Sequence, residues 1–237
     1  MERIQKVIAN RGYCSRRKAE ELIKEGKVLI NGEKAEIGAK VSGSDIITIN
    51  GKTLTEDRKE YVLLYKPRGV VTTTSDEKNR KTVLDLIETE KRLYPIGRLD
   101  YDTTGILLLT NDGELTNLLT HPKNEIEKVY IAKIEGLIHK TDIIKLCKGV
   151  IIDGVKTSEA KARIRKIDKK TNSSIVELVI HEGKNHQVKK MFEAIGYKVE
   201  KLKREKIAFL DLSGLKSGEY RYLNTKEVKR LYSLTKK

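Results

Sequence analysis

Apolar positions near the start of the chain repeat first at helical and then at strand spacing. In residues 4–11 and 16–25 they recur three or four apart, which predicts two short helices, the second capped by Ser15. Short apolar runs at 28–30 and 46–49 then each lead into Asn-Gly, the pair most typical of a two-residue hairpin turn. The pattern predicts two helices followed by a small sheet.

A polar stretch at residues 53–60, with sequence TLTEDRKE, separates this start from the rest of the chain, and we interpret it as a linker. The apolar run at 61–65 opens a larger unit. We expect strands there at 106–109, 129–134 and 175–180, and helices at 82–88, 114–119, 141–148 and 186–194. Without a regular βαβ repeat, this mixture predicts an α+β fold with a mixed, largely antiparallel sheet. The expected division is a first domain at 1–52, a linker at 53–60 and a second domain at 61–237.

The net charge of the chain indicates what kind of partner it binds. Lys and Arg number 49 against 34 Asp and Glu in 237 residues, a formal charge of +15, which favours a polyanion such as nucleic acid. No apolar run approaches the roughly 20 residues of a membrane span, and the N-terminus lacks the pattern of a secretion signal. Cys14 and Cys147 lack the spacing of a zinc site or a disulfide framework. We therefore expect a cytoplasmic protein with no membrane contact.

Several kinds of catalytic site are excluded by their spacing. His181 and His186 have no ligand-type residues nearby that would complete a metal site. Gly183-Lys184 lacks the earlier glycine and the following Ser or Thr of a phosphate-binding loop, and no GxSxG nucleophile motif is present. Any chemistry must therefore use carboxylates, Lys, Tyr or His, and we expect no metal.

The densest candidate segment is GRLDYDTTG at 97–105, which precedes an apolar strand. Two interpretations are open from the residues alone. Asp100 either forms a local ion pair with Arg98 in a polar loop, or it is a catalytic carboxylate on a loop anchored by a rigid strand.

The first fifty residues, with helix, SRRKAEELI, Gly, strand and Asn-Gly in that order, resemble the S4-type RNA-binding domain. That resemblance implies that basic residues on the two helices face an RNA helix. Together with the helix-corner cluster, the expected RNA-binding residues here are Arg3, Lys6, Arg11, Arg16, Arg17 and Lys18.

The rest of the chain resembles the RNA pseudouridine synthases, in the branch that modifies single sites in ribosomal RNA. GRLDYDTTGILLLTNDGEL is similar to the catalytic motif of that family, and YKPRGVVTT at 65–73 and EGKNHQVKKMFEAIG at 182–196 follow the family's order. The family isomerises uridine to pseudouridine without gaining or losing atoms, so the resemblance also implies no cofactor. The target base must be flipped into a pocket.

By that resemblance Asp100 is the nucleophile, which attacks either C1′ of the ribose or C6 of the base, and Asp102 is the second candidate. Tyr130 is expected to stack on the base and to help move the C5 proton. Lys189 stands where the family commonly has the Arg that pairs with the nucleophile. Lysine keeps the charge but loses the two-pronged geometry of Arg.

Further expectations concern RNA contacts and partners. We expect substrate-binding residues at Arg98, Val188, Lys66, Asn185 and Gln187, and a backbone-binding track that includes Lys190, Lys203 and Arg204. The expected partner is ribosomal RNA, of the large subunit (23S) or its assembly intermediate, bound by a monomer with no obligate protein partner. Two alternatives remain: a synthase for small-subunit (16S) RNA, and a non-catalytic assembly factor, against which the intact Asp100 and Tyr130 argue.

Overall fold

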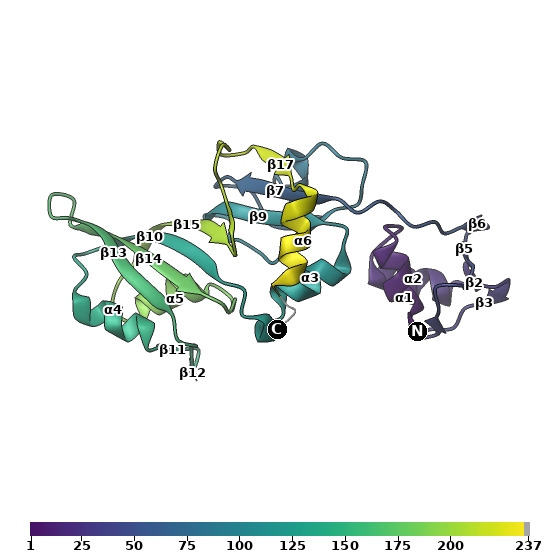
Figure 1. Ribbon diagram of the computed structural model, residues 1–237, viewed down its shortest axis with the longest axis horizontal. Coiled ribbons are helices and arrows are strands. Elements are labelled where there is room, and N and C mark those ends of the chain that lie inside the picture. The colour runs from purple at the N-terminus through teal and green to yellow at the C-terminus, as the bar shows by residue number, and fades with distance from the viewer. Residues whose placement is uncertain (235–237) are drawn as a thin grey trace.

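A computed structural model describes residues 1–234 of the protein (Figure 1). The N-terminal unit holds two helices and short strands. Its elements are β1 (Glu2–Arg3), α1 (Ile4–Asn10), α2 (Arg16–Lys24), β2 (Val28–Ile30), β3 (Glu33–Lys34), β4 (Lys40–Val41), β5 (Ile47–Ile49) and β6 (Lys52–Thr53). Strands β3, β2, β5 and β6 form one antiparallel sheet in that order.

Local sequence signals explain this unit. The Ser15 hydroxyl accepts a 3.1 Å hydrogen bond from the backbone N–H of Lys18, which caps α2 as predicted. Both Asn-Gly pairs take left-handed backbone angles, with φ of 51° and 91° at Asn31 and Gly32, so both hairpins form. The apolar faces of the helices and the sheet close one hydrophobic cluster that runs from Ile4 to Leu54.

The larger unit is built around a nine-stranded sheet in the order β13-β14-β10-β15-β9-β7-β17, with β8 paired to β9 and β16 to β15. Its strands and helices are β7 (Tyr61–Lys66), η1 (Leu84–Leu86), β8 (Tyr94–Ile96), β9 (Thr104–Thr110), α3 (Gly113–Thr120), η2 (Pro122–Asn124), β10 (Lys128–Glu135), α4 (Lys140–Cys147), β11 (Ile151–Ile152), β12 (Val155–Lys156), β13 (Lys161–Asp168), β14 (Ser173–Ile180), α5 (Gln187–Glu193), β15 (Val199–Ile207), β16 (Leu210–Asp211), β17 (Tyr220–Tyr222) and α6 (Thr225–Ser233). The α+β fold with a mixed, mostly antiparallel sheet is confirmed.

Strands β7 and β9 are apolar along most of their length because both of their faces are buried, with helices on both sides of the sheet (Figure 1). Alternate residues of β7 point to opposite faces: Val62 and Leu64 join one cluster and Leu63 joins the other. Helices α4 and α5 cover the first face, whereas α3 and α6 cover the second. The strands that carry the connecting loops are therefore held firmly by packing on both faces.

The expected helix at 82–88 is wrong. Only the 3-10 turn Leu84–Leu86 forms, because the residues before it are held extended against Val71: Val71 N–H donates to the Lys81 carbonyl and Val83 N–H donates to Val71. Ile87 then turns back to extended backbone and buries its side chain. Strands β13 and β15 and helix α6 were not predicted, because charged residues alternate with the apolar ones along them.

The stretch expected as a linker is held at both ends. Leu54 packs into the N-terminal cluster, and the Asn111 side chain bonds the backbone of Arg58 (3.0 Å) and Glu60 (2.8 Å). Lys59 donates to the carbonyl of Asn10. None of the helices in residues 1–234 has the length and apolar character needed to cross a membrane.

The sheet has one parallel junction, between β9 and β15. There Thr104 lies opposite Lys203 and Gly105 lies opposite Arg204, and the neighbouring strands on either side run antiparallel. Gly105 has a φ of +118°, and a Cβ at this position would stand 2.2 Å from the carbonyl oxygen of Arg204. Only glycine lets the two backbones approach so closely.

We predict that Gly105→Ala destabilises the protein by about 3 kcal/mol, because the added methyl meets backbone that no side-chain rotation can clear. Urea denaturation followed by circular dichroism measures the loss. Gly43→Ala is the control, since nothing lies within 4 Å of its Cβ position and its φ is not positive. An equal, small change in both variants would show that the junction tolerates a side chain.

Candidate active site

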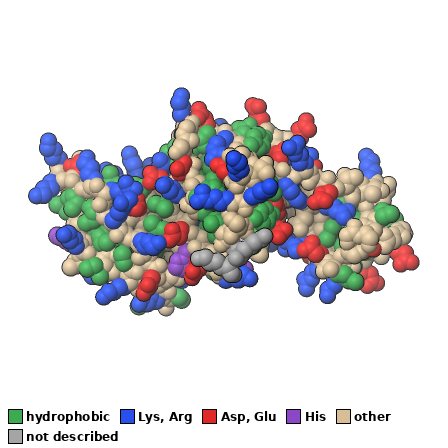
Figure 2. All heavy atoms as spheres, in the orientation of Figure 1, with side chains coloured by type: hydrophobic (Ala, Val, Ile, Leu, Met, Phe, Trp, Pro, Cys, Tyr) green, Lys and Arg blue, Asp and Glu red, His purple; other side chains and the backbone are tan. Residues whose placement is uncertain are grey.

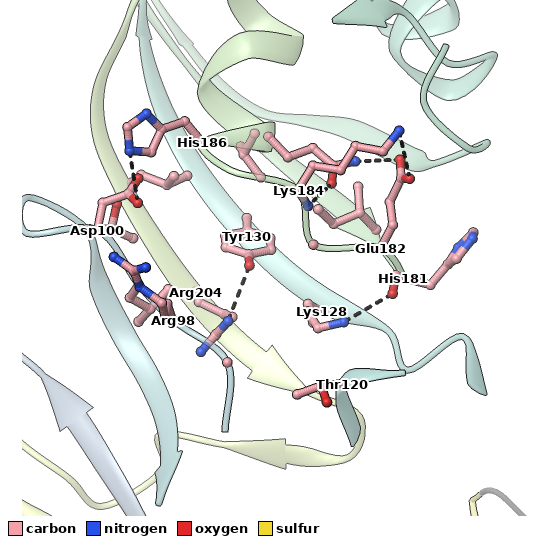
Figure 3. Close-up of a pocket in the computed structure, with 18 of the residues that line it drawn as sticks. Arg98, Asp100, Thr120, Lys128, Tyr130, His181, Glu182, Lys184, His186 and Arg204 are labelled. Atoms are coloured by element: carbon pink, nitrogen blue, oxygen red, sulfur yellow. Dashed lines mark hydrogen bonds and ion pairs between the residues drawn. The ribbon is translucent and has the colours of Figure 1, made fainter. Parts of the chain in front are cut away.

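A pocket of about 380 Å³ opens beside the parallel junction, a size suited to a small ligand group (Figure 3). Its walls come from the loop before β9, from β10 and β15, and from the loop between β14 and α5. Thr120 and Pro122 close one end. Segments separated by about a hundred residues in sequence therefore share one cavity.

Lys66 fixes the loop that carries Asp100. Its side chain is fully buried, and its ammonium donates to the carbonyl oxygens of Pro67 (3.1 Å), Asp100 (3.0 Å) and Thr103 (2.9 Å). Burial lowers the pKa of Lys66 to about 8, although Asp100 and Asp102 oppose this effect. The sequence predicts Lys66 as a substrate-binding residue; in the structure all three of its N–H donors bond backbone carbonyls, two of them in the loop that carries Asp100.

Lys189 joins the two acidic residues of the loop. Its ammonium lies 3.1 Å from a carboxylate oxygen of Asp100 and 2.6 Å from one of Asp102. Partial burial raises the pKa of Asp102, but the bond and charge of Lys189 outweigh it, so that pKa lies below its usual range. The pairing of Lys189 with Asp100 that the sequence led us to expect is thus present, whereas no Arg98–Asp100 ion pair occurs within residues 1–234.

His186 is a neighbour of Asp100 that sequence reasoning missed. Its Nε2 atom lies 3.4 Å from Asp100, on the side of the carboxylate away from Tyr130 in Figure 3. His186 has a left-handed backbone, with φ of 53°, at the start of α5. The signal was present in the motif EGKNHQVKK, where His186 precedes the helix that carries Lys189.

Tyr130 stands in the middle of the pocket, almost fully buried, and its hydroxyl points toward Arg204 (Figure 3). Arg204 Nη1 lies 3.4 Å from that hydroxyl, and Arg204 Nε donates to the carbonyl of Ile106 at 2.9 Å. Arg204 is 3% exposed. The sequence predicts Arg204 on a backbone-binding track; in the structure strand alternation turns its side chain into the pocket, while Lys203 faces away, over the Tyr65 ring.

Of the other expected substrate residues, Val188, Arg98 and Gln187 line the pocket and Asn185 does not. Val188 is buried and lines the pocket, and Arg98 is exposed at its edge. Gln187 is buried and lines the pocket too, but its amide is engaged: it donates to Glu182 and accepts from the Lys184 N–H. Gln187 thus orders the loop before α5. Asn185 is exposed and does not line the pocket.

The basic residues of the N-terminal unit differ in their surroundings. Arg3, Arg16 and Arg17 are exposed and make no ion pair within the described chain. Lys6 pairs with Glu2, and Lys18 pairs with Glu21 at 2.8 Å. Arg11 is half-buried and donates to the Leu54 carbonyl at 3.1 Å, so it is a structural contact rather than a free cation.

Basic residues are not confined to that unit. Figure 2 shows Lys and Arg spread over the whole visible face, with acidic side chains between them. Lys190, expected on a backbone track, pairs with Asp153 at 2.5 Å. Among residues 1–234, no group of three or more His, Cys, Asp or Glu side chains is arranged to hold a metal ion.

Lys128 is the second pocket residue that sequence reasoning missed. It lies two positions before Tyr130 on β10, so strand alternation puts both on the same face, and it lines the pocket. Burial, and next the charge of Arg204, lower the pKa of Lys128 to about 8. The spacing Lys-x-Tyr in EKVY was the available signal.

Comparison with known proteins agrees with this geometry. The family model described as RNA pseudouridylate synthase matches residues 60–194, and the S4 domain model matches residues 2–47. The chain is 56% identical over 236 residues to the ribosomal large subunit pseudouridine synthase B of Bacillus subtilis (strain 168), covering 99% of this chain and 97% of that protein.

Two further comparisons extend across the whole chain. The dual-specificity RNA pseudouridine synthase RluF of Escherichia coli (strain K12) is 36% identical, over 98% of this chain and 79% of that protein. A crystal structure titled pseudouridylate synthase superposes with a TM-score of 0.69 at 33% identity, covering 98% of this chain and 100% of that one. The chain therefore belongs to the RNA pseudouridylate synthase family, with an S4 domain at its N-terminus.

Proposed function

We propose that the protein isomerises one specific uridine of large-subunit ribosomal RNA to pseudouridine, with Asp100 as the nucleophile. The observation that carries this proposal is the Asp100 carboxylate, held 3.1 Å from the Lys189 ammonium, which opens onto the same pocket as Tyr130. The large-subunit target is supported by the name of the Bacillus subtilis relative at 56% identity.

The isomerisation needs only the side chains of Asp100, Lys189, Tyr130 and Val188. The N1–C1′ bond of the uridine breaks, the base turns, C5 bonds to C1′, and the C5 proton leaves while N1 regains a proton. The Asp100 carboxylate attacks C1′ or C6, with the Lys189 ammonium beside it to hold its orientation. Tyr130 offers a flat face for the flipped base, and its hydroxyl takes part in moving the C5 proton. Val188 packs beside the base.

The N-terminal unit supplies RNA affinity in this proposal. Exposed, unpaired arginines such as Arg16 and Arg17 suit phosphate contacts, which release counterions from the RNA. The protein acts as a monomer in the cytoplasm, on ribosomal RNA or its assembly intermediate. An assembly factor without activity would have no use for a lysine-paired carboxylate in a closed pocket.

The direct test incubates the purified protein with unmodified 23S and 16S RNA and maps new pseudouridines by carbodiimide-dependent reverse-transcription stops. A single new stop in 23S RNA is expected. A stop only in 16S RNA would move the target to the small subunit, and none in either RNA would refute the proposed activity.

We predict that Asp100→Asn lowers the single-turnover rate by about 10⁴-fold or more, because Asn has the same shape but is not a nucleophile. RNA affinity and melting temperature should stay within error. Asp102→Asn is the matched control and should lose at most about tenfold, since it only shares Lys189. The reverse order of the two losses would make Asp102 the nucleophile.

Lys189→Met should lower the rate by about 10²- to 10³-fold, because it removes the cation beside Asp100. Lys189→Arg should keep most of the activity, since arginine preserves the charge and can bridge both carboxylates. Rates and melting temperatures are measured together, so that a folding defect is recognised. Full activity of the Met variant would reduce Lys189 to a structural residue.

Arg16→Ala combined with Arg17→Ala should weaken RNA binding and make its salt dependence shallower by about 0.7–0.9 log units per lost phosphate contact. Filter binding at several salt concentrations gives both quantities. Lys169→Ala with Lys170→Ala is the control of equal charge, because these residues are exposed in the β13–β14 turn, in the larger unit. Equal losses in the two double variants would show that only net charge matters.

A further inference from the structure

The end of the pocket away from Asp100 holds two cations, Lys128 and Arg204. In Figure 3 they lie on either side of the hydroxyl end of Tyr130. The Lys128 ammonium donates to the carbonyls of Ile126 (3.0 Å) and His181 (3.1 Å), which leaves one of its three N–H bonds free.

Arg204 also keeps unused donors. Its Nε bonds the Ile106 carbonyl and its Nη1 lies near the Tyr130 hydroxyl, but Nη2 is buried without a hydrogen-bond partner. A buried guanidinium nitrogen without a partner is costly and calls for an explanation. The Arg204 guanidinium therefore keeps hydrogen-bonding capacity beside the pocket that no group of the described chain uses.

Neither cation is neutralised by an acid. Within residues 1–234, no carboxylate forms an ion pair with Lys128 or Arg204, whereas Lys189 at the other end of the pocket has two. Two half-buried or buried like charges that face one pocket repel each other, which destabilises the empty site. Negative charge placed between the two cations would relieve this repulsion.

The reaction places negative charge on the base itself. If Asp100 attacks C1′, the electron pair of the broken N1–C1′ bond stays on uracil and spreads over N1, O2 and O4. If Asp100 adds to C6, the electrons of the C5–C6 double bond move toward O4 as an enolate. Both routes therefore place negative charge on carbonyl oxygens of the uracil ring.

Geometry directs those oxygens toward the two cations. A uridine with C1′ or C6 near Asp100 and its ring on Tyr130 extends its far edge into the part of the pocket that Lys128 and Arg204 line. We propose that Lys128 and Arg204 bind the carbonyl oxygens of the uracil ring and stabilise the negative charge that the ring carries while it is detached or saturated at C6. This inference rests on the proposed function.

An RNA phosphate is the competing occupant. Backbone phosphates remain hydrated and are met by exposed side chains, but Arg204 is 3% exposed and two of the Lys128 donors already bond carbonyls. A ring oxygen, by contrast, reaches this depth when the base is flipped. Loss of a phosphate contact would appear in RNA affinity, whereas loss of charge stabilisation would appear in rate.

The charge of Lys128 gives the site a pH dependence. The groups that face it are Arg204 from β15 and His181 and Glu182 from the end of β14, and the Glu182 carboxylate is occupied by Gln187 and Lys184. Because the pKa of Lys128 is lowered to about 8, its cation is present below that pH and lost as pH rises through it. The rate should therefore fall on the alkaline side.

The experiment compares wild type, Lys128→Gln, Lys128→Arg and Arg204→Lys in single-turnover assays on the ribosomal RNA that the wild type modifies. Lys128→Gln should lose about 10²-fold in rate, with RNA affinity and its salt slope unchanged. Lys128→Arg should recover most of the rate and move the alkaline decline to higher pH. Lys123→Gln, an exposed lysine nearby, is the control.

The outcomes separate the possibilities. If the rate of Lys128→Arg falls at the same alkaline pH as that of the wild type, the fall belongs to Lys66, whose pKa is also about 8. That result would overturn the role of Lys128. A weaker affinity with a shallower salt slope would make the occupant a phosphate. If Lys128→Gln does not fold, the pH profile of Lys128→Arg and the rate of Arg204→Lys still test whether the two cations stabilise charge on the ring. An inactive wild type would refute the proposed function, whereas an active wild type with unaffected variants would refute only this inference.

Discussion

The close backbone contact between Gly105 and Arg204 is the constraint on which the site depends. It joins two antiparallel halves of the sheet through one parallel junction. On one side, Lys66 pairs with Gly105 in register and holds the Asp100 loop by its carbonyls. On the other side, Arg204 carries its side chain to Tyr130. The main-chain junction thus fixes the two residues whose side chains, Lys66 and Arg204, hold the acidic and the aromatic parts of the pocket.

The two ends of the pocket use positive charge in different ways. At one end a single ammonium, that of Lys189, lies between Asp100 and Asp102, so two carboxylates share one cation. At the other end Lys128 and Arg204 have no acidic partner among the described residues. The Lys189 ammonium is a point charge that the two carboxylates approach from different directions.

Much of the fold could be predicted from the sequence because local signals agreed with the tertiary structure. Helix caps, Asn-Gly turns and the continuous apolar runs of β7 and β9 all placed their elements correctly. The errors arose where long-range contacts decide. Lys66 and Arg204 look like surface cations in a basic sequence, and only the sheet shows that both are buried. Lys128 could have been found, since alternation from Tyr130 puts it on the pocket side.

The distance in sequence between the two strands of the junction also orders events during synthesis. The N-terminal unit closes its core with residues 4–54, so it can fold soon after it emerges. The pocket needs Arg204, which follows Gly105 by nearly a hundred residues, and such a non-local contact forms late. A nascent chain therefore has helices α1 and α2 in place well before its pocket is complete.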